Sequence, residues 1–456
     1  MRFKRRVNML EGSLLPNILL FAIPLMISGI LQLLFNAIDM IVVGKFSGST
    51  SMAAVSSTSS LINLVTNLFI GLSVGTSVSI ARRIGEGKRE EVSKAVQTSV
   101  LISLVTGGIL AVFGVISARY LLQRMKSPED VIDLSTLYLR VYFTGMPGTM
   151  VYNFGSAILR AKGDTRRPLQ ALSVAGVLNA LLNLVFVLVV KMDVAGVGLA
   201  SSLSSYVSAF LVIDCLVHET SEVKLDIHHL YIDKAALWEI VRIGLPAGVQ
   251  GTLFSLSNVV IQSSINSYGK IVMAGNGAAT SIEGFVYNAM AAFNQTCLTF
   301  TSQNMGAGKL KRVVPISIYS QLCVIVTGIL LGGGAYLFGN LLLKIYASDP
   351  EVIAAGMIRL SYVSKNYFLC GIMDVFVGSL RGIGSSMVPM MVSLIGVCAF
   401  RLVWIATVYQ SSPTIETLYL SYPISWIITA MVHMICFMIL YLVRQKEQQK
   451  LSAAAQ

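Results

Sequence analysis

The stretch "ILRAKGDTRRP" (residues 158–168) occurs twice in the chain in related form, and this repetition decides the fold. The later copy, "SLRGIGSSMVP" (379–389), lies in the second half of the chain and keeps three residue types in register: Arg160 with Arg381, Gly163 with Gly384, and Pro168 with Pro389. A second pair of stretches, "RIGEGKREEV" (83–92) and "NMGAGKLKRV" (304–313), aligns at the same offset. Two matches in one register indicate that the chain arose by internal duplication.

The sequence around these repeated stretches has the composition of a membrane protein. Of the 456 residues, 55% are hydrophobic and 12% are charged, whereas a soluble domain carries about 25% charged residues. Charge-free runs such as 46–81, 243–269 and 417–443 exceed the roughly 20 residues that a helix needs to cross the hydrocarbon. Lipid offers no partners to backbone N–H and C=O groups, so these segments must be helical. The composition therefore predicts an all-α integral membrane protein.

Apolar runs and polar connections together predict twelve transmembrane helices, six in each copy. The most polar long connection, 218–235, separates an N-terminal six-helix lobe over 1–222 from a C-terminal six-helix lobe over 223–456. Because each copy has an even number of spans, the two lobes should run in the same direction, related by a pseudo-symmetry axis along the membrane normal. The expected spans are 14–44, 51–80, 93–117, 131–158, 167–190, 194–217, 236–267, 272–303, 312–340, 351–379, 387–409 and 415–443.

The charged residues favour one orientation in the membrane. The net charge is +12, and Lys and Arg concentrate in both termini and in alternate connections, which the positive-inside rule assigns to the cytoplasm. One connection, 117–130, is an exception, since it carries Arg119, Arg124 and Lys126 on the predicted outer side. We expect a multi-pass membrane protein with cytoplasmic termini and no nucleic-acid partner. The sequence contains no phosphate-loop motif and no catalytic constellation, so we expect neither a cofactor nor an enzyme activity.

One carboxylate, Asp39, lies inside an apolar span, in "LLFNAIDMIVVG" (33–44). A charge at the centre of a membrane helix costs about 2.5–3.5 kcal/mol. Asn36 lies near it on the same helix, and the fifth and sixth spans offer further polar groups at helical spacing, among them Asn179, Asn183 and Ser201. These oxygens suit a proton relay or a monovalent cation. A polar cluster that only holds helices together is the alternative, and it explains the amides and hydroxyls better than it explains a carboxylate.

The C-terminal lobe lacks the acid. When Pro24 is aligned with Pro246, Asn36 corresponds to Asn258, whereas Asp39 corresponds to Ile261. We therefore expect the ion chemistry in the N-terminal lobe. Other polar residues within spans are candidates for a substrate cavity: Gln32, Asn258, Gln262, Glu283, Asp374 and Arg401. Ion pairing among the charged members of this set is the alternative to substrate contact.

Taken together, "LLFNAIDMIVVGKFSG" (33–48), "GLSVGTSVSIARRIGEGK" (71–88) and "VGSLRGIG" (377–384) resemble the multidrug and toxic compound extrusion (MATE) family, in particular its DinF-like bacterial branch. The resemblance implies twelve helices in two lobes that form a V and open alternately to the two sides of the membrane. It also implies a cation site in the N-terminal lobe, at Asp39, Asn179, Asn183 and Ser201. This chain departs from the family at two of these positions, because Asn183 stands where many relatives have Asp and Ser201 stands for Thr.

These observations lead us to expect a secondary active multidrug exporter. Entry of H⁺ (or Na⁺) at Asp39 would drive efflux of small organic, often cationic, compounds by alternating access. The resemblance to a bacterial branch implies the bacterial cell (inner) membrane, and we expect a monomer in the lipid bilayer. The alternative within the same superfamily is a flippase for a lipid-linked precursor. Such flippases line their cavity with several cationic residues, whereas the spans here offer few.

Overall fold

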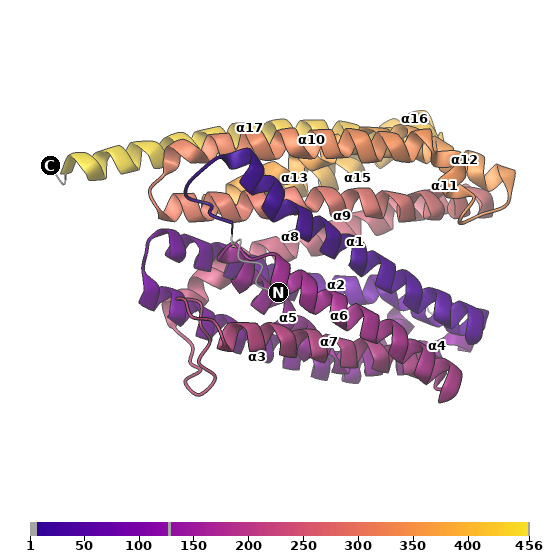
Figure 1. Ribbon diagram of the computed structural model, residues 1–456. Helices are drawn as coiled ribbons and strands as arrows, with labels where there is room; N and C mark the ends of the chain where they lie inside the picture. Colours follow the sequence, from indigo (N-terminus) through magenta and orange to yellow (C-terminus); the bar gives the residue numbers. More distant parts are fainter. Residues whose placement is uncertain (1–6, 126–128, 455–456) are drawn as a thin grey trace. The chain divides into compact units, whose positions relative to one another are not determined.

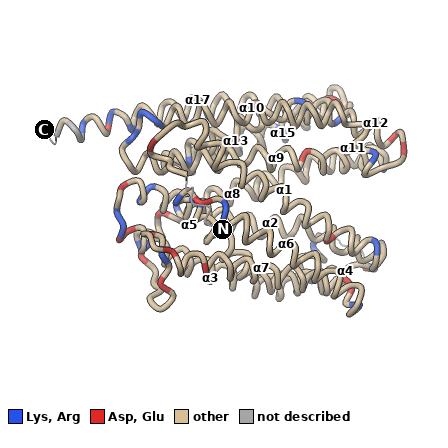
Figure 2. The backbone as a smooth tube through the Cα atoms, in the orientation of Figure 1, with Lys and Arg blue, Asp and Glu red and all other residues tan. Residues whose placement is uncertain are grey.

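The computed structural model describes residues 7–125 and 129–454, and these residues form helices joined by short connections, with no strand. They make twelve long helical runs, four of which are interrupted by a break or a change of helix type. Eight helices are long and apolar enough to cross a membrane. The other runs are either broken into shorter helices or carry more polar residues. Charged residues gather at the helix ends and in the connections (Figure 2).

The chain divides into two compact units. The first comprises Ile30–Gly248, and the second comprises Val7–Gly29 with Val249 to the C-terminus. Two helices contribute to both units: α1 (Leu14–Phe46) and α8 (Lys234–Asn266).

The remaining elements of unit 1 are α2 (Ser49–Gly85), α3 (Arg89–Arg124), α4 (Glu129–Thr144), α5 (Met146–Ala161), α6 (Arg166–Leu184), the π-helical η1 (Val185–Val189) and α7 (Asp193–Val217). The remaining elements of unit 2 are α9 (Lys270–Gly306), η2 (Leu310–Arg312), α10 (Val313–Leu337), α11 (Gly339–Leu343), α12 (Pro350–Tyr362), η3 (Ser364–Asn366), α13 (Tyr367–Gly382), α14 (Met387–Ser393), η4 (Leu394–Ala399), α15 (Phe400–Ala406), α16 (Val408–Ser411) and α17 (Ile415–Ala454) (Figure 1).

This division differs from the sequence-based boundary at 222/223, because each unit takes in half a helix from the other side of that boundary. The first half of α1 packs into unit 2, where Phe21 is fully buried and meets Phe300 edge-to-face, with 5.5 Å between ring centroids. The first half of α8 packs into unit 1, where Ile240 is fully buried. A Cβ atom built on Gly75 would lie 2.1 Å from the carbonyl oxygen of Ile240, so α2 and α8 cross in backbone contact.

The duplication is visible in the backbone. Three pairs of glycines, all at the offset that relates Arg160 to Arg381, have nearly equal positive φ angles: Gly48 and Gly269 (91° and 90°), Gly87 and Gly308 (70° and 69°), and Gly163 and Gly384 (98° and 98°). These φ values are rarely accessible to other L-residues. The turns between successive helices therefore repeat in geometry, and the prediction of two pseudo-symmetric helical lobes is confirmed.

A buried ion cluster ties the connection after α7 to the turn between α5 and α6. The Glu219 carboxylate, 2% exposed, lies 2.9 Å from Lys162 Nζ and 2.6 Å from Arg167 Nη2. Arg167 also pairs with Asp164. Burial by itself would raise the pKa of Glu219, but the hydrogen bonds from Arg167 and Lys162 outweigh it and lower the pKa from 4.5 to about 2. This cluster therefore stabilises the connection as long as Glu219 is ionised.

Candidate cation-coupling site

Asp39 lies on the second half of α1, which packs directly against α6. The contact between the two helices is made by the ring of Phe35 and the backbone of Gly176. A Cβ atom on Gly176 would lie 1.8 Å from Phe35 Cε2, so only glycine leaves room for the ring. Phe35 is one turn before Asp39, and Gly176 is two turns before Asn183. This contact therefore brings the carboxylate beside the amides of α6.

Four polar side chains from α1, α6 and α7 form a closed ring of hydrogen bonds. Asn183 Nδ2 donates to Asp39 Oδ1, and Ser201 Oγ donates to Asp39 Oδ2 at 3.3 Å. Asn179 Nδ2 donates to Ser201 Oγ at 3.3 Å, while Asn179 Oδ1 accepts from Asn183 Nδ2 at 3.2 Å. The structure thus brings together Asp39, Asn179, Asn183 and Ser201, although 162 residues separate the first from the last.

One oxygen of the ring has no hydrogen-bond partner among the described residues. Asn183 is completely buried, and its Oδ1 atom is unsatisfied. A buried amide oxygen without a partner costs about 1–3 kcal/mol. The π-helical segment η1 begins two residues after Asn183, and such segments often occur at functional sites. The unsatisfied oxygen and the local irregularity mark this part of α6 as a place where a ligand can be accommodated.

Two tyrosines that the sequence reasoning missed belong to the surroundings of Asp39. Tyr138 and Tyr142 on α4 lie within electrostatic reach of its carboxylate, and their ring centroids are 5.7 Å apart. Their spacing of four residues places both on one helix face. This pattern was readable in the sequence, but nothing there indicated that the face meets α1.

Asn36, expected at this site, and Gln32, expected in the substrate cavity, both lie apart from the ring. Asn36 and Gln32 are exposed on α1, and neither makes a hydrogen bond to any described residue. Asn36 precedes Asp39 by three residues, so its side chain is rotated by about 60° around the helix from that of Asp39. The rotation of α1 about its axis that points Asp39 toward α6 therefore points Asn36 away from the ring.

The buried charges of unit 2 are arranged differently. Glu283 on α9 pairs with Arg359 on α12, with Arg359 Nη2 2.7 Å from Glu283 Oε2. Arg359 Nη1 also donates to Asn276 Oδ1 at 2.8 Å, and Asn276 Nδ2 donates to Gln262 Oε1 at 2.9 Å. The sequence reasoning did not single out Arg359, whose role depends on a partner 76 residues away. Of the proposed cavity residues, Glu283 and Gln262 thus join one network, and ion pairing accounts for Glu283.

The other proposed cavity residues occupy separate positions in unit 2. Asp374 is buried and interacts electrostatically with Arg381, whose Nη2 donates to Gln250 Oε1 at 2.7 Å. Arg401 is 3% exposed, lies over the ring of Tyr422 with 4.1 Å from Cζ to the centroid, and has no carboxylate partner among the described residues. A cation–π contact compensates part of its burial. Asn258 is exposed on α8.

The chemistry available in the ring is that of hard oxygen ligands around a single acid. The carboxylate, two amide groups and one hydroxyl can hold a proton or a monovalent cation. The described residues contain no cluster of three His, Cys, Asp or Glu side chains that could hold a metal ion. Asp39 is the only ionisable side chain among the four members of the ring, so it is the group of the ring whose charge can change.

Known proteins match this chain over most of its length. A model of the MatE family matches residues 24–185 and 246–406, one segment in each copy. The probable multidrug resistance protein YpnP of Bacillus subtilis (strain 168) is 28% identical over 397 residues, covering 86% of this chain and 87% of that protein. The probable multidrug resistance protein NorM of Thermotoga maritima is 26% identical over 415 residues, covering 88% of each.

Solved structures share the fold of this chain. The structure described as "Crystal structure of MATE in complex with MaL6" has a TM-score of 0.90 at 21% identity, and the match covers 97% of this chain and 100% of that one. The family model covers well over half of the residues, in the two segments that the internal duplication predicts. The chain therefore belongs to the MatE family and is a multi-pass membrane transporter rather than an enzyme.

Proposed function

We propose that this transporter is a multidrug exporter that couples the inward movement of H⁺ or Na⁺ to the efflux of organic, often cationic, compounds. The coupling ion binds at Asp39, within the ring that Asn179, Asn183 and Ser201 complete. Export follows alternating access in a bacterial cell membrane, with both chain termini in the cytoplasm. The names of the relatives as multidrug resistance proteins support the substrate class. The hydrogen-bonded ring around a single carboxylate is the observation that carries the proposal.

Proton coupling would use both polar atoms of the Asn183 amide, the donor Nδ2 and the acceptor Oδ1. When Asp39 is ionised, the amide presents Nδ2 to the carboxylate, and Oδ1 lacks a partner. When Asp39 binds a proton, rotation of the amide would present Oδ1, which then accepts the hydrogen bond from the new O–H group. The rotation breaks the present bond from Asn183 Nδ2 to Asn179 Oδ1. Protonation thereby replaces the charge-assisted hydrogen bond between α1 and α6 with a weaker one between neutral groups.

Sodium would use the same atoms in another way. A sodium ion takes oxygen ligands, and the ring can offer the Asp39 carboxylate, the Oδ1 atoms of Asn179 and Asn183, and Ser201 Oγ. The single carboxylate balances a single monovalent charge. Either ion removes the net charge of Asp39, and we propose that this neutralisation lets α1 repack and release substrate.

The proposal is tested by efflux of a fluorescent cationic dye in proteoliposomes containing wild type or Asp39→Asn. A pH gradient and a Na⁺ gradient are imposed separately. We expect wild type to respond to one gradient, which identifies the ion, and Asp39→Asn to respond to neither while folding normally. Asn36→Ala is the matched control, since Asn36 lies on the same helix outside the ring, and it should transport like wild type. Gradient-driven efflux by Asp39→Asn at the wild-type rate would refute the assignment.

A further inference from the structure

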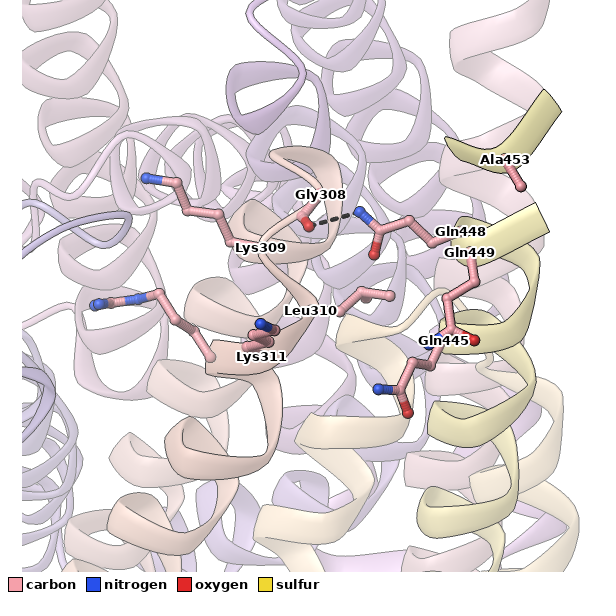
Figure 3. A pocket seen from close by; sticks show the side chains of 9 residues that line it. Gly308, Lys309, Leu310, Lys311, Gln445, Gln448, Gln449 and Ala453 are labelled. Carbon is pink, nitrogen blue, oxygen red and sulfur yellow. Dashed lines mark hydrogen bonds between the residues drawn. The ribbon is translucent and has the colours of Figure 1, made fainter. Parts of the chain in front are cut away.

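A pocket of about 590 Å³ lies at the end of unit 2 where the turn between α9 and α10 faces the last turns of α17. Gly308 to Arg312 form one wall, and Gln445, Gln448 and Gln449 contribute to the other (Figure 3). Gln448 Nε2 donates to the carbonyl oxygen of Gly308 at 2.7 Å, which joins the two walls. The pocket is distant in sequence from the residues around Asp39 and serves no purpose in the coupling described above.

The turn that lines this pocket carries three cations, and no described carboxylate lies within ion-pair distance of them. Lys309 Nζ donates to the carbonyl oxygen of Leu10 at 3.1 Å, and Arg312 Nη2 donates to that of Gly12 at 3.2 Å. The Nε atom of Arg312 is buried without a partner. Lys311 is exposed and makes no polar contact with any described residue. Carbonyl oxygens satisfy some of the donors, but they leave the net charge of the turn uncompensated.

The other copy of the duplication provides an internal comparison. The glycine at the start of each turn has the same φ within 1° (Gly87 and Gly308), so the two turns share their geometry. At the positions that correspond to Lys311 and Arg312, the first copy has Glu90 and Glu91.

These two glutamates compensate the positive charge of the turn in the first copy. Glu90 lies 2.7 Å from Lys94, and Glu91 lies 3.7 Å from Lys88. The first copy thus compensates its own cations, whereas the second has basic residues at the same two positions. The charge reversal is specific to the copy that has the pocket.

The pocket lies where a membrane surface is expected. α10 and α17 are both apolar enough to span the bilayer. α17 has 40 residues, which at 1.5 Å per residue is about twice the thickness of the hydrocarbon. Its last turns therefore leave the membrane beside the basic turn, and in Figure 1 this end of α17 projects past the other helices of its unit. These turns add Arg444, Lys446 and Lys450 and one acid, Glu447, which pairs with Arg444 at 2.9 Å. Basic clusters directly adjoining a transmembrane helix attract anionic lipids.

We propose that this pocket binds the phosphate group of an anionic phospholipid headgroup from the adjoining leaflet. Lys311 and Arg312 supply the positive charge, and the amides of Gln445 and Gln449 donate hydrogen bonds to the phosphate and glycerol oxygens. The volume lies within the range of pockets that hold small molecules. The headgroup supplies the negative charge that Glu90 and Glu91 supply in the other copy.

Native mass spectrometry of the full chain in detergent, titrated with phosphatidylglycerol or phosphatidylcholine, tests this proposal. Lys311→Glu introduces the charge that the first copy carries at Glu90, and Arg89→Glu makes the same charge change on an exposed residue of the other turn. A basic residue near a lipid surface contributes about fivefold in affinity. We expect wild type to prefer phosphatidylglycerol, Lys311→Glu to lose more than about tenfold in apparent affinity for it, and Arg89→Glu to bind like wild type.

A second variant separates hydrogen bonding from charge. Gln445→Leu keeps every cation and removes one donor, so it should weaken phosphatidylglycerol binding while leaving the thermal midpoint unchanged. Three results would overturn the proposal: equal losses in Lys311→Glu and Arg89→Glu, no preference for phosphatidylglycerol over phosphatidylcholine, or displacement of the lipid by inorganic phosphate at equal concentration. The last result would assign the pocket to a soluble phosphate compound instead of a lipid.

Discussion

At the scale of the residue, the central question is why position 39 is an aspartate and not an asparagine. An asparagine at this position could accept the hydrogen bond from Asn183 at its oxygen and donate from its NH2 group to Ser201 Oγ, without placing a charge in the membrane. If the ring only held the helices together, asparagine would suffice, because an uncharged residue costs less free energy in the membrane. The carboxylate adds one property that an amide lacks, which is a change of charge when it binds a proton or a cation.

The same residue-scale argument predicts the effect of adding a second carboxylate. Asn183→Asp replaces the Nδ2 donor that contacts Asp39 with a second negative oxygen, and two carboxylates this close require a cation between them. We expect the apparent affinity for Na⁺ to rise by about tenfold or more, measured as Na⁺ stimulation of dye efflux. Gln32→Glu adds the same charge on an exposed part of α1 and should have little effect. Equal stimulation in both variants would contradict a specific site.

The sequence predicted all four members of the ring but few of its surroundings. Asp39, Asn179, Asn183 and Ser201 could be identified because an intramembrane acid is conspicuous, because helical spacing groups the two asparagines on one face, and because the family resemblance pointed to the same positions. Arg359 could not be identified as the partner of Glu283, since it lies on another helix and helical spacing relates residues of one helix only. The rotation that removes Asn36 from the ring depends on how α1 meets α6, which is a property of packing.

At the scale of the element, the site depends on the close approach of α1 and α6. Gly176→Ala places a methyl group where the Phe35 ring lies, and overpacking of this kind costs about 1–3 kcal/mol. We expect a lower thermal midpoint and a loss of ion-driven efflux, because α1 moves away from Asn183. In the double variant, Phe35→Leu should restore part of the thermal midpoint and part of the ion-driven efflux, because the smaller side chain leaves room for the new methyl group. Additive effects of the two substitutions would show that residues 35 and 176 do not interact energetically, which would contradict this contact.

A second prediction concerns the connection after α7. The ion cluster lowers the pKa of Glu219 to about 2, so the folded state gains stability at pH values above the unfolded pKa of about 4.5 and loses it as the pH falls toward 2. Glu219→Gln should lower the thermal midpoint by a few degrees at neutral pH. The difference from wild type should then shrink as the pH falls through 4.

The matched control for this prediction is Glu222→Gln in the same connection, because Glu222 makes no ion pair with a described residue. It should leave the midpoint unchanged at every pH. A difference between wild type and Glu219→Gln that stays constant down to pH 3 would show that ionisation of Glu219 does not stabilise the fold.

At the scale of the whole molecule, the two units are interdependent because each contains half a helix from the other copy. Val7–Gly29 contributes to the core of unit 2, and the start of α8 contributes to the core of unit 1. We expect fragments 1–225 and 226–456 to copurify when they are coexpressed and to be degraded when either is expressed alone. A normal yield of folded protein from one fragment expressed alone would contradict this interdependence. The measurement is affinity copurification followed by dye efflux from the reconstituted pair.

The duplication itself was predictable from the sequence. The assignment of the first half of α1 to unit 2 and of the first half of α8 to unit 1 was not. The register that pairs Arg160 with Arg381 requires only the sequence, and the equal φ angles of Gly163 and Gly384 follow from it. The unit boundary falls inside the continuous helices α1 and α8, near Gly29 and Gly248, and no polar connection marks it. Composition locates boundaries in connections, so it placed the boundary at the polar segment 218–235.

If substrate and coupling ion bind alternately through Asp39, as we propose, binding of substrate must release the ion, and this release can be measured directly. Purified wild-type protein in weakly buffered detergent solution is mixed with the dye, and released protons are followed with a pH indicator. Release of radiolabelled Na⁺ from preloaded protein is followed in parallel. We expect the dye to displace one of these ions from wild type and from Asn36→Ala, and neither ion from Asp39→Asn. Equal ion release from wild type and Asp39→Asn would show that the ion is not bound through Asp39.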